Sequence, residues 1–107
     1  MLPAHRAEDT MPEFSTTVLD LTQTGSDLTL RQLSVLLLLH RRRSDAHERQ
    51  VHALAAALAL NKPAITRAAD KLEKAELIRR GSLSEDRRSC TLTLTKTGEK
   101  LAARLVG

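Results

Sequence analysis

The chain has 107 residues, a formal net charge of +4 and one aromatic residue, Phe14. This length provides one small hydrophobic core and hence one domain. Its only cysteine, Cys90, excludes an internal disulfide and a multi-cysteine zinc site. No apolar run is long enough for a signal peptide or a membrane span, so we expect a cytoplasmic protein without membrane contact.

The basic balance favours a polyanionic partner but does not identify it. Charge alone fits an ordinary basic surface equally well. Proteins that bind single-stranded nucleic acid, and most RNA-binding modules, stack bases on aromatic side chains. Because this chain has almost none, double-stranded DNA is the better candidate among the polyanions.

The N-terminal region divides into two predicted segments. Residues 1–11 are polar and lack periodicity, which predicts a flexible tail. Residues 12–107 form the predicted domain, and its first part, residues 12–24, has apolar spacing typical of a short amphipathic helix. The pattern shows that this helix has an apolar face to bury, but not what covers that face.

The next predicted helix begins at Leu30, because Thr29 and Gln32 have the spacing of a capping box. It extends to about residue 43 and should be central, because apolar residues cover most of its sides. Its expected stripe is Leu30, Leu33, Leu36 and Leu37. The arginines that end it, residues 41–43, suit the helix dipole and indicate a solvated face more than a phosphate contact.

Two further helices are predicted over residues 49–58 and 62–75, joined by a turn at residues 59–61. Asn61 should cap the second of them, and Pro63 fits its first turn. The expected buried stripe of that helix consists of Ile65, Ala68, Ala69, Leu72 and Ala75. Its other face carries Lys62, Thr66, Arg67, Asp70, Lys71 and Lys74.

After Leu77 the apolar period changes to two, which predicts strands at residues 78–80 and 90–94 around a basic loop. Cys90 should point inward as an inert thiol, and Thr91 should point outward. A final helix is expected over residues 96–105. The predicted fold class is mainly α with a small β-hairpin (α+β), a winged helix-turn-helix.

The stretch from residue 61 to residue 98 resembles the MarR family of bacterial transcription regulators, whose motif is a T-R-x-x-D-x-L-E helix, then D-x-R, then L-x-L-T-x-x-G. The matching residues are Lys62, Thr66, Arg67, Asp70, Leu72, Glu73, Leu77, Asp86, Arg88, Leu92, Leu94, Thr95 and Gly98. The resemblance covers residues 28–106. It implies a recognition helix in a major groove and a wing at the minor groove or phosphates.

We predict the following contacts for the recognition helix, residues 62–75. Lys62, Thr66 and Arg67 lie in its N-terminal half, and Arg67 suits the edge of a guanine. Pro63 and Ala64 suit a thymine methyl group. Lys71, like Lys62 and Lys74, is placed for phosphates, which add affinity more than sequence choice.

The predicted wing, residues 82–89, supplies the second set of contacts. The resemblance implies that Arg88 enters a minor groove, where narrow A/T-rich DNA concentrates negative potential. Arg87 is expected on the backbone. Asp86 repels phosphate, so its expected role is to orient a neighbouring arginine.

The chain departs from the family pattern at two places. Glu76 stands where many relatives have glycine, in a position that suits a left-handed helix end. The chain stops at Gly107, whereas MarR-like proteins usually continue into another helix that builds the dimer. We therefore expect a homodimer through the N-terminal helix, a monomer on adjacent sites, or a protein partner.

No metal or cofactor is expected. His47 and His52 are five residues apart, which is not a helical-face pair, and no cysteines lie near them. No catalytic constellation is apparent, so we do not expect an enzyme. The predicted function is sequence-specific regulation of transcription on double-stranded DNA, with repression as the default. The alternatives are a winged-helix protein-interaction module and a nonspecific, nucleoid-type DNA binder.

Overall fold

The computed structural model describes Leu19, residues 28–81 and residues 90–106. The elements in these ranges are α3 (Leu30–Arg41), the 3-10 turn η1 (His47–Arg49), α4 (Val51–Leu58), α5 (Lys62–Lys74), β1 (Ile78–Gly81), β2 (Thr91–Leu94) and α6 (Lys96–Val106). The predicted tail, nearly all of the predicted N-terminal helix and the predicted wing lie outside the described residues. No helix within the described ranges has the length and apolar character to cross a membrane.

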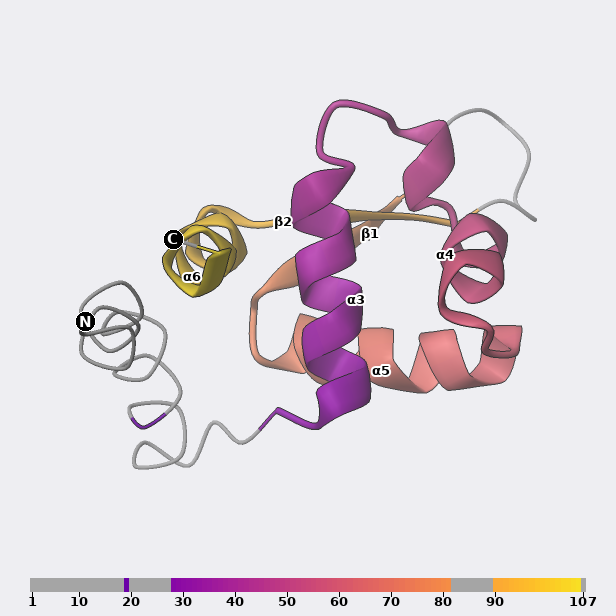
Figure 1. Cartoon of the computed structure of the whole chain (residues 1–107), viewed down its shortest axis with the longest axis horizontal. Helices are drawn as coiled ribbons and strands as arrows, with labels where there is room; N and C mark the ends of the chain where they lie inside the picture. Colours follow the sequence, from indigo (N-terminus) through magenta and orange to yellow (C-terminus); the bar gives the residue numbers. More distant parts are fainter. Residues whose placement is uncertain (1–18, 20–27, 82–89, 107) are drawn as a thin grey trace, which may run out of the picture.

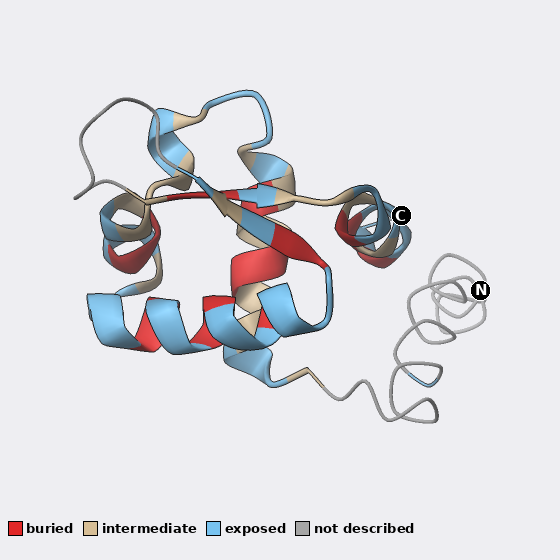
Figure 2. Ribbon diagram, turned by 180° about the vertical axis from the view of Figure 1, so that it is seen from behind, coloured by how far each residue is buried: buried red, intermediate tan, exposed pale blue. Residues whose placement is uncertain are grey.

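The helices surround α3, which packs against α4, α5, α6 and β2. In Figure 1, α5 crosses the N-terminal end of α3, while α4 and α6 lie on opposite sides of it. Figure 2 shows that buried residues line the faces that these helices turn toward one another. The arrangement confirms the predicted class of a helical domain with a small hairpin.

The capping box predicted for α3 is confirmed. The Thr29 hydroxyl accepts a bond from the Gln32 amide at 3.1 Å, and the Gln32 side chain accepts one from the Thr29 amide at 3.2 Å. Leu30 is 81% exposed, so its assignment to the buried stripe was wrong. The fully buried positions are Val35, Leu36 and Leu39, because the middle of α3 faces the other helices.

The helix α3 ends at Arg41, two residues earlier than predicted. The next two arginines turn back onto local carbonyls. Nη1 of Arg42 donates to the Glu48 carbonyl at 2.9 Å, and Nη1 of Arg43 donates to the His40 carbonyl at 2.7 Å. The Arg43 bond helps to satisfy a carbonyl in the last turn of α3, and the Arg42 bond joins the end of α3 to η1.

The turn between α4 and α5 is closed by a left-handed residue that is not glycine. Ala59 has φ 55°, and the amide of Leu60 donates to the Ala55 carbonyl at 2.9 Å. Asn61 then caps α5 as predicted, because its side-chain oxygen accepts from the Ala64 amide at 2.8 Å. Residues 59–61 thus provide hydrogen bonds both for a carbonyl at the end of α4 and for an amide at the start of α5.

The buried stripe of α5 is confirmed at Ile65, Ala68, Ala69 and Leu72. Ala75 is exposed instead of buried, because it is the C-cap residue of the helix. The helix ends through Glu76, which has φ 61°. The amides of Glu76 and Leu77 donate to the carbonyls of Glu73 and Leu72, both at 2.9 Å, in the pairing of a Schellman motif.

Strands β1 and β2 pair antiparallel, with Ile78 opposite Leu94 and Arg80 opposite Leu92. Thr91 was expected to face outward but is only 5% exposed, and Cys90 is half-buried rather than buried. The cause is a single antiparallel bridge between Gln50 and Thr91, which brings the start of α4 against this strand. The alternation of apolar and polar residues along this strand is therefore not enough to determine which of its side chains are buried.

The N-terminus of α6 is bonded to the turn that ends α5. The Thr95 hydroxyl donates to the Glu76 carbonyl at 2.7 Å, and the Thr95 amide donates to the Leu77 carbonyl at 3.0 Å. The same hydroxyl accepts from the Gly98 amide at 3.1 Å. Thr95 therefore caps α6 and fixes that helix to the end of α5.

Candidate nucleic-acid interface

The candidate interface is the exposed face of α5, which begins at the Asn61 cap. Figure 2 shows that exposed and buried positions alternate along this helix. The exposed predicted contacts are Lys62, Pro63, Thr66, Arg67 and Lys71, and Lys74 is exposed as well. The helix therefore presents four basic side chains and one hydroxyl to solvent.

Ala64 is the exception among the predicted α5 contacts. It is 4% exposed and belongs to the buried positions of the helix. A methyl group that faces the core is not available to a base, so the predicted contact with a thymine methyl does not fit this residue. Pro63, beside it in the first turn, is exposed.

Within the described residues, the ion pairs of α5 involve its acidic side chains and not its basic ones. Asp70, which lies three residues after Arg67 on the same helix, pairs with Arg80 of β1 and not with Arg67. Across residues 28–81 and 90–106, no ion pair or side-chain hydrogen bond involves Lys62, Arg67 or Lys71. A cation without an internal partner can form an ion pair with an external anion.

Arg80 is the residue at this site that sequence reasoning missed. Its Nη2 donates to the Asp70 carboxylate and lies 3.5 Å from the Thr66 carbonyl oxygen. Its Nε lies 3.3 Å from Oε1 of Glu73. The only sequence signal was an arginine on a strand and two acids on a helix, and nothing in their spacing along the chain joins them.

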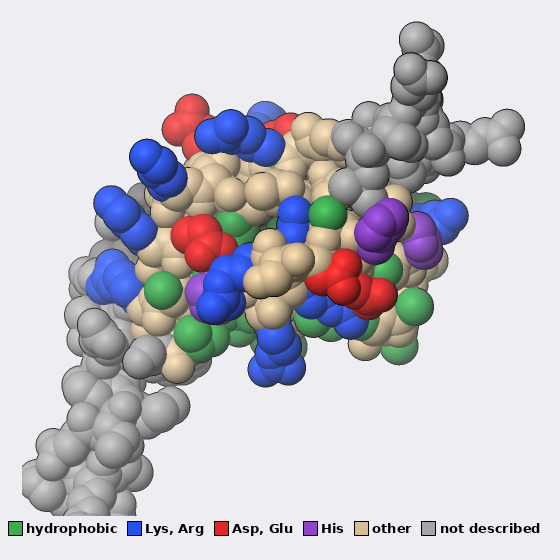
Figure 3. All heavy atoms as spheres, turned by 90° about the horizontal axis from the view of Figure 1, so that it is seen from above, with side chains coloured by type: hydrophobic (Ala, Val, Ile, Leu, Met, Phe, Trp, Pro, Cys, Tyr) green, Lys and Arg blue, Asp and Glu red, His purple; other side chains and the backbone are tan. Residues whose placement is uncertain are grey.

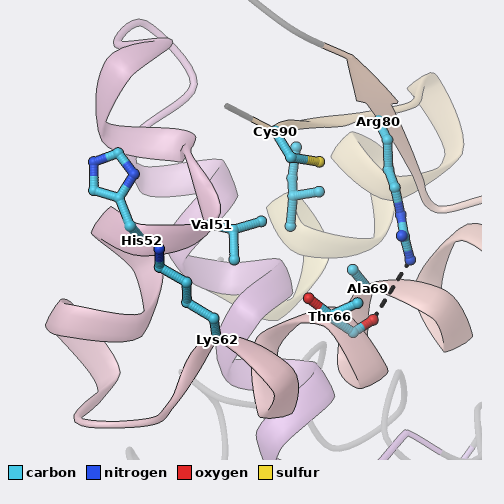
Figure 4. Close-up of a pocket in the computed structure, with 8 residues that line it drawn as sticks. Val51, His52, Lys62, Thr66, Ala69, Arg80 and Cys90 are labelled. Carbon is cyan, nitrogen blue, oxygen red and sulfur yellow. Dashed lines mark hydrogen bonds between the residues drawn. The ribbon is translucent and has the colours of Figure 1, made fainter. Parts of the chain in front are cut away.

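A cleft of about 280 Å³ lies between α4, α5 and the hairpin. Figure 4 shows Lys62 and Thr66 entering it from α5, with His52 on α4 and Arg80 on β1. Val51, Ala69, Cys90 and Leu92 complete its lining. The cleft therefore runs along the inner edge of the candidate interface and separates α5 from β1 there.

The opposite end of the molecule has mixed charge. Figure 3 looks onto the end of α3 that is remote from α5, and basic and acidic side chains lie close together there. Arg42, for example, lies 3.5 Å from the carboxylate of Glu48. This face resembles the solvated surface predicted for the arginines that end α3.

Asp86, Arg87 and Arg88 lie outside the described residues, so their predicted contacts remain predictions. In the described part of the chain, no group of three His, Cys, Asp or Glu side chains is arranged to hold a metal ion.

The family model of the MarR family matches residues 28–90, which include α3, α4, α5 and β1. The comparison with curated protein sequences gives no match. Several solved structures are similar in fold, and three of them are informative.

The DNA complex of MepR from Staphylococcus aureus is 24% identical, with a TM-score of 0.72, over 98% of this chain and 79% of that one. A MepR mutant bound to an oligodeoxyribonucleotide is 23% identical, with the same TM-score, over 99% and 74%. ZitR from Lactococcus lactis, a zinc-responsive MarR family member, is 25% identical, with a TM-score of 0.63, over 75% and 52%. The family match covers more than half of the sequence, and the chain therefore belongs to the MarR family of transcription regulators.

Proposed function

We propose that the chain binds double-stranded DNA at preferred sequences and represses transcription by occluding promoters. The observation that carries this proposal is the exposure of Lys62, Thr66 and Arg67 on the N-terminal half of α5. In helix-turn-helix proteins, that half of the recognition helix contacts base edges. The membership of the MarR family and the similarity in fold to MepR bound to DNA support the same proposal.

The proposed contacts divide into two kinds. Arg67 has the planar donors that suit O6 and N7 of a guanine, and Thr66 contacts a base or a phosphate beside it. Lys62 and Lys71 are placed for phosphates, where positive charge adds affinity with little sequence choice. In the wing segment, we assign Arg88 to the minor groove, Arg87 to the backbone and Asp86 to orienting them.

We propose further that the chain binds DNA as a homodimer, in which the N-terminal helices join the two copies. One small domain forms a small interface with DNA, so pairing increases specificity. The exposure of a large apolar side chain in that segment supports this proposal, since Leu19 is 60% exposed. Such a side chain is available to a second copy or to another protein.

The test is selection of duplexes from a random library with the full chain at near-physiological salt. Enrichment of one motif is the expected result, and a palindromic motif would report a pair through the spacing of its half-sites. Retention of DNA without enrichment would replace the proposal with nonspecific, nucleoid-type binding. Failure to retain any DNA would leave the protein-interaction module as the better reading.

A matched pair of variants links the selected motif to α5. Arg67→Gln removes a cation from the proposed interface, and Lys100→Gln removes one from an exposed position of α6. Only the first should weaken binding to the selected motif. Equal effects of both would mean that bulk charge, and not this face of α5, retains the DNA.

A further inference from the structure

One arginine of the hairpin holds two turns of α5. The guanidinium of Arg80 reaches Thr66, Asp70 and Glu73, which lie on one side of the helix. The other end of this link is fixed, because Arg80 pairs with Leu92 in the sheet and Leu92 is fully buried. The side chain of Arg80 is itself only 28% exposed. The link therefore joins a buried part of the hairpin to the helix that carries the candidate interface.

Because a cleft separates α5 from the hairpin on this side, the Arg80 link helps to set the distance between them. The cleft lies between α5 and the hairpin, and Figure 4 shows Arg80 extending from β1 to the backbone carbonyl of Thr66. Where side chains interdigitate, packing fixes the distance between elements. Beside a cleft of about 280 Å³, packing is missing on that side, and the Arg80 contacts take its place.

We infer that Arg80 is a positioning residue, which sets the distance and rotation between α5 and the hairpin and thereby the sequence preference of the DNA complex. The inference rests on the proposed function. Base contacts from a recognition helix require a fixed orientation in the groove, whereas phosphate contacts tolerate small shifts. Loss of the link should therefore reduce discrimination between sequences more than it reduces affinity for any DNA.

Arg80 is a poor candidate for a direct phosphate contact. It lies between two carboxylates, Asp70 and Glu73, which outnumber its single positive charge. A phosphate approaching the Arg80 guanidinium would have to compete with these two carboxylates. The planar guanidinium instead suits the bridging of two carboxylates, and a lysine ammonium does so less well.

The test compares two variants that remove the link but change the charge in opposite directions. Arg80→Gln removes a positive charge, and Asp70→Asn combined with Glu73→Gln removes two negative charges. The measurement is the ratio of Kd for a scrambled duplex to Kd for the duplex selected by the wild type, over a series of salt concentrations. Both variants are expected to lower this ratio by about tenfold, because each releases α5 from the hairpin.

Controls separate positioning from stability and from charge. Arg79→Gln removes the same charge from the neighbouring exposed position of β1 and should leave the ratio unchanged. Arg80→Lys keeps the charge and should recover part of the ratio. Thermal melts establish that each variant is folded at the temperature of the binding measurement, and the two variants that remove the link give independent readings.

Three outcomes would overturn the inference. If the effects follow charge, with one variant weaker and the other stronger on both duplexes, Arg80 acts electrostatically. If the melting temperature falls while the ratio stays at the wild-type value, its role is structural only. If the wild type does not distinguish the duplexes, the proposed function fails, and the inference fails with it.

Discussion

The carbonyl oxygen of Leu77 occupies the space that a side chain at Gly98 would need. Gly98 is buried in the first turn of α6, and a Cβ atom there would overlap this oxygen and come within 3.2 Å of the Leu94 side chain. The close approach follows from Thr95, which bonds to the backbone of Glu76 and Leu77. The family motif L-x-L-T-x-x-G therefore has a physical basis here: the threonine draws α6 onto the end of α5, and the glycine leaves room for it.

Gly98→Ala should lower the free energy of unfolding by about 2–3 kcal/mol, because a backbone carbonyl must move to admit the methyl group. Urea denaturation followed by circular dichroism measures this change. Gly81→Ala is the matched control, since nothing lies within 4 Å of a Cβ atom at that position. A Gly98→Ala variant as stable as Gly81→Ala would show that α6 is not held this closely.

Glycine should stabilise the chain at the two left-handed positions, Ala59 and Glu76. A side chain in this conformation costs about 1–2 kcal/mol, and the greater freedom of glycine in the unfolded chain offsets part of the gain. We expect each substitution to raise the free energy of unfolding by about 0.5–1 kcal/mol.

The control is Ala57→Gly, an exposed position inside α4, where glycine should destabilise by about 1 kcal/mol. Thermal melts at one protein concentration distinguish the three variants. If Ala59→Gly and Ala57→Gly lowered the melting temperature equally, the left-handed turn at the end of α4 would be absent in solution.

The features that the sequence predicted well depend on residues close together in the chain. The capping box of Thr29 and Gln32 and the cap at Asn61 each involve residues three apart, so local pattern is enough. The buried stripe of α5 is also local, because helical period alone places its members on one side. The same helical period predicted that Lys62, Arg67 and Lys71 lie on the outer face of α5, and all three are exposed.

The features that could not be predicted from the sequence depend on contacts between segments that are distant in the chain. Thr91 is buried because Gln50 pairs with it, and Leu30 is exposed although the helical period includes it. Arg80 pairs with Asp70 and Glu73 from another element of the fold. Periodicity describes one element at a time, so it cannot report which surfaces of two elements meet.

Arg49 should contribute strongly to stability, because it bonds to three carbonyl groups from two parts of the fold. Its Nε donates to the Leu92 carbonyl at 3.0 Å, and its Nη1 donates to those of Arg42 and Arg43 at 3.1 and 2.8 Å. Hydrogen bonds from a charged donor contribute about 1.5–3 kcal/mol. Arg49→Gln should therefore lower the free energy of unfolding by about this amount.

Arg41→Gln is the control for Arg49, since Arg41 is exposed at the end of α3. Its effect on urea denaturation should stay within about 0.5 kcal/mol. A similar loss in both variants would mean that positive charge at the end of α3, and not the three bonds of Arg49, stabilises this region.

The proposed division between base and phosphate contacts on α5 predicts opposite behaviour for Arg67 and Lys71. Arg67→Gln should relax the preference at one base pair of the selected motif, at a cost of about 1–3 kcal/mol for the preferred base. Lys71→Gln should weaken binding to all duplexes alike and lower the slope of log Kd against log salt by about one. Fluorescence anisotropy with the selected duplex, single-base variants of it and a scrambled duplex measures both quantities. Lys100→Gln, on α6, should change neither. If Arg67→Gln weakened binding to all duplexes equally, Arg67 would contact a phosphate and not a base. The sequence preference would then have to come from other side chains.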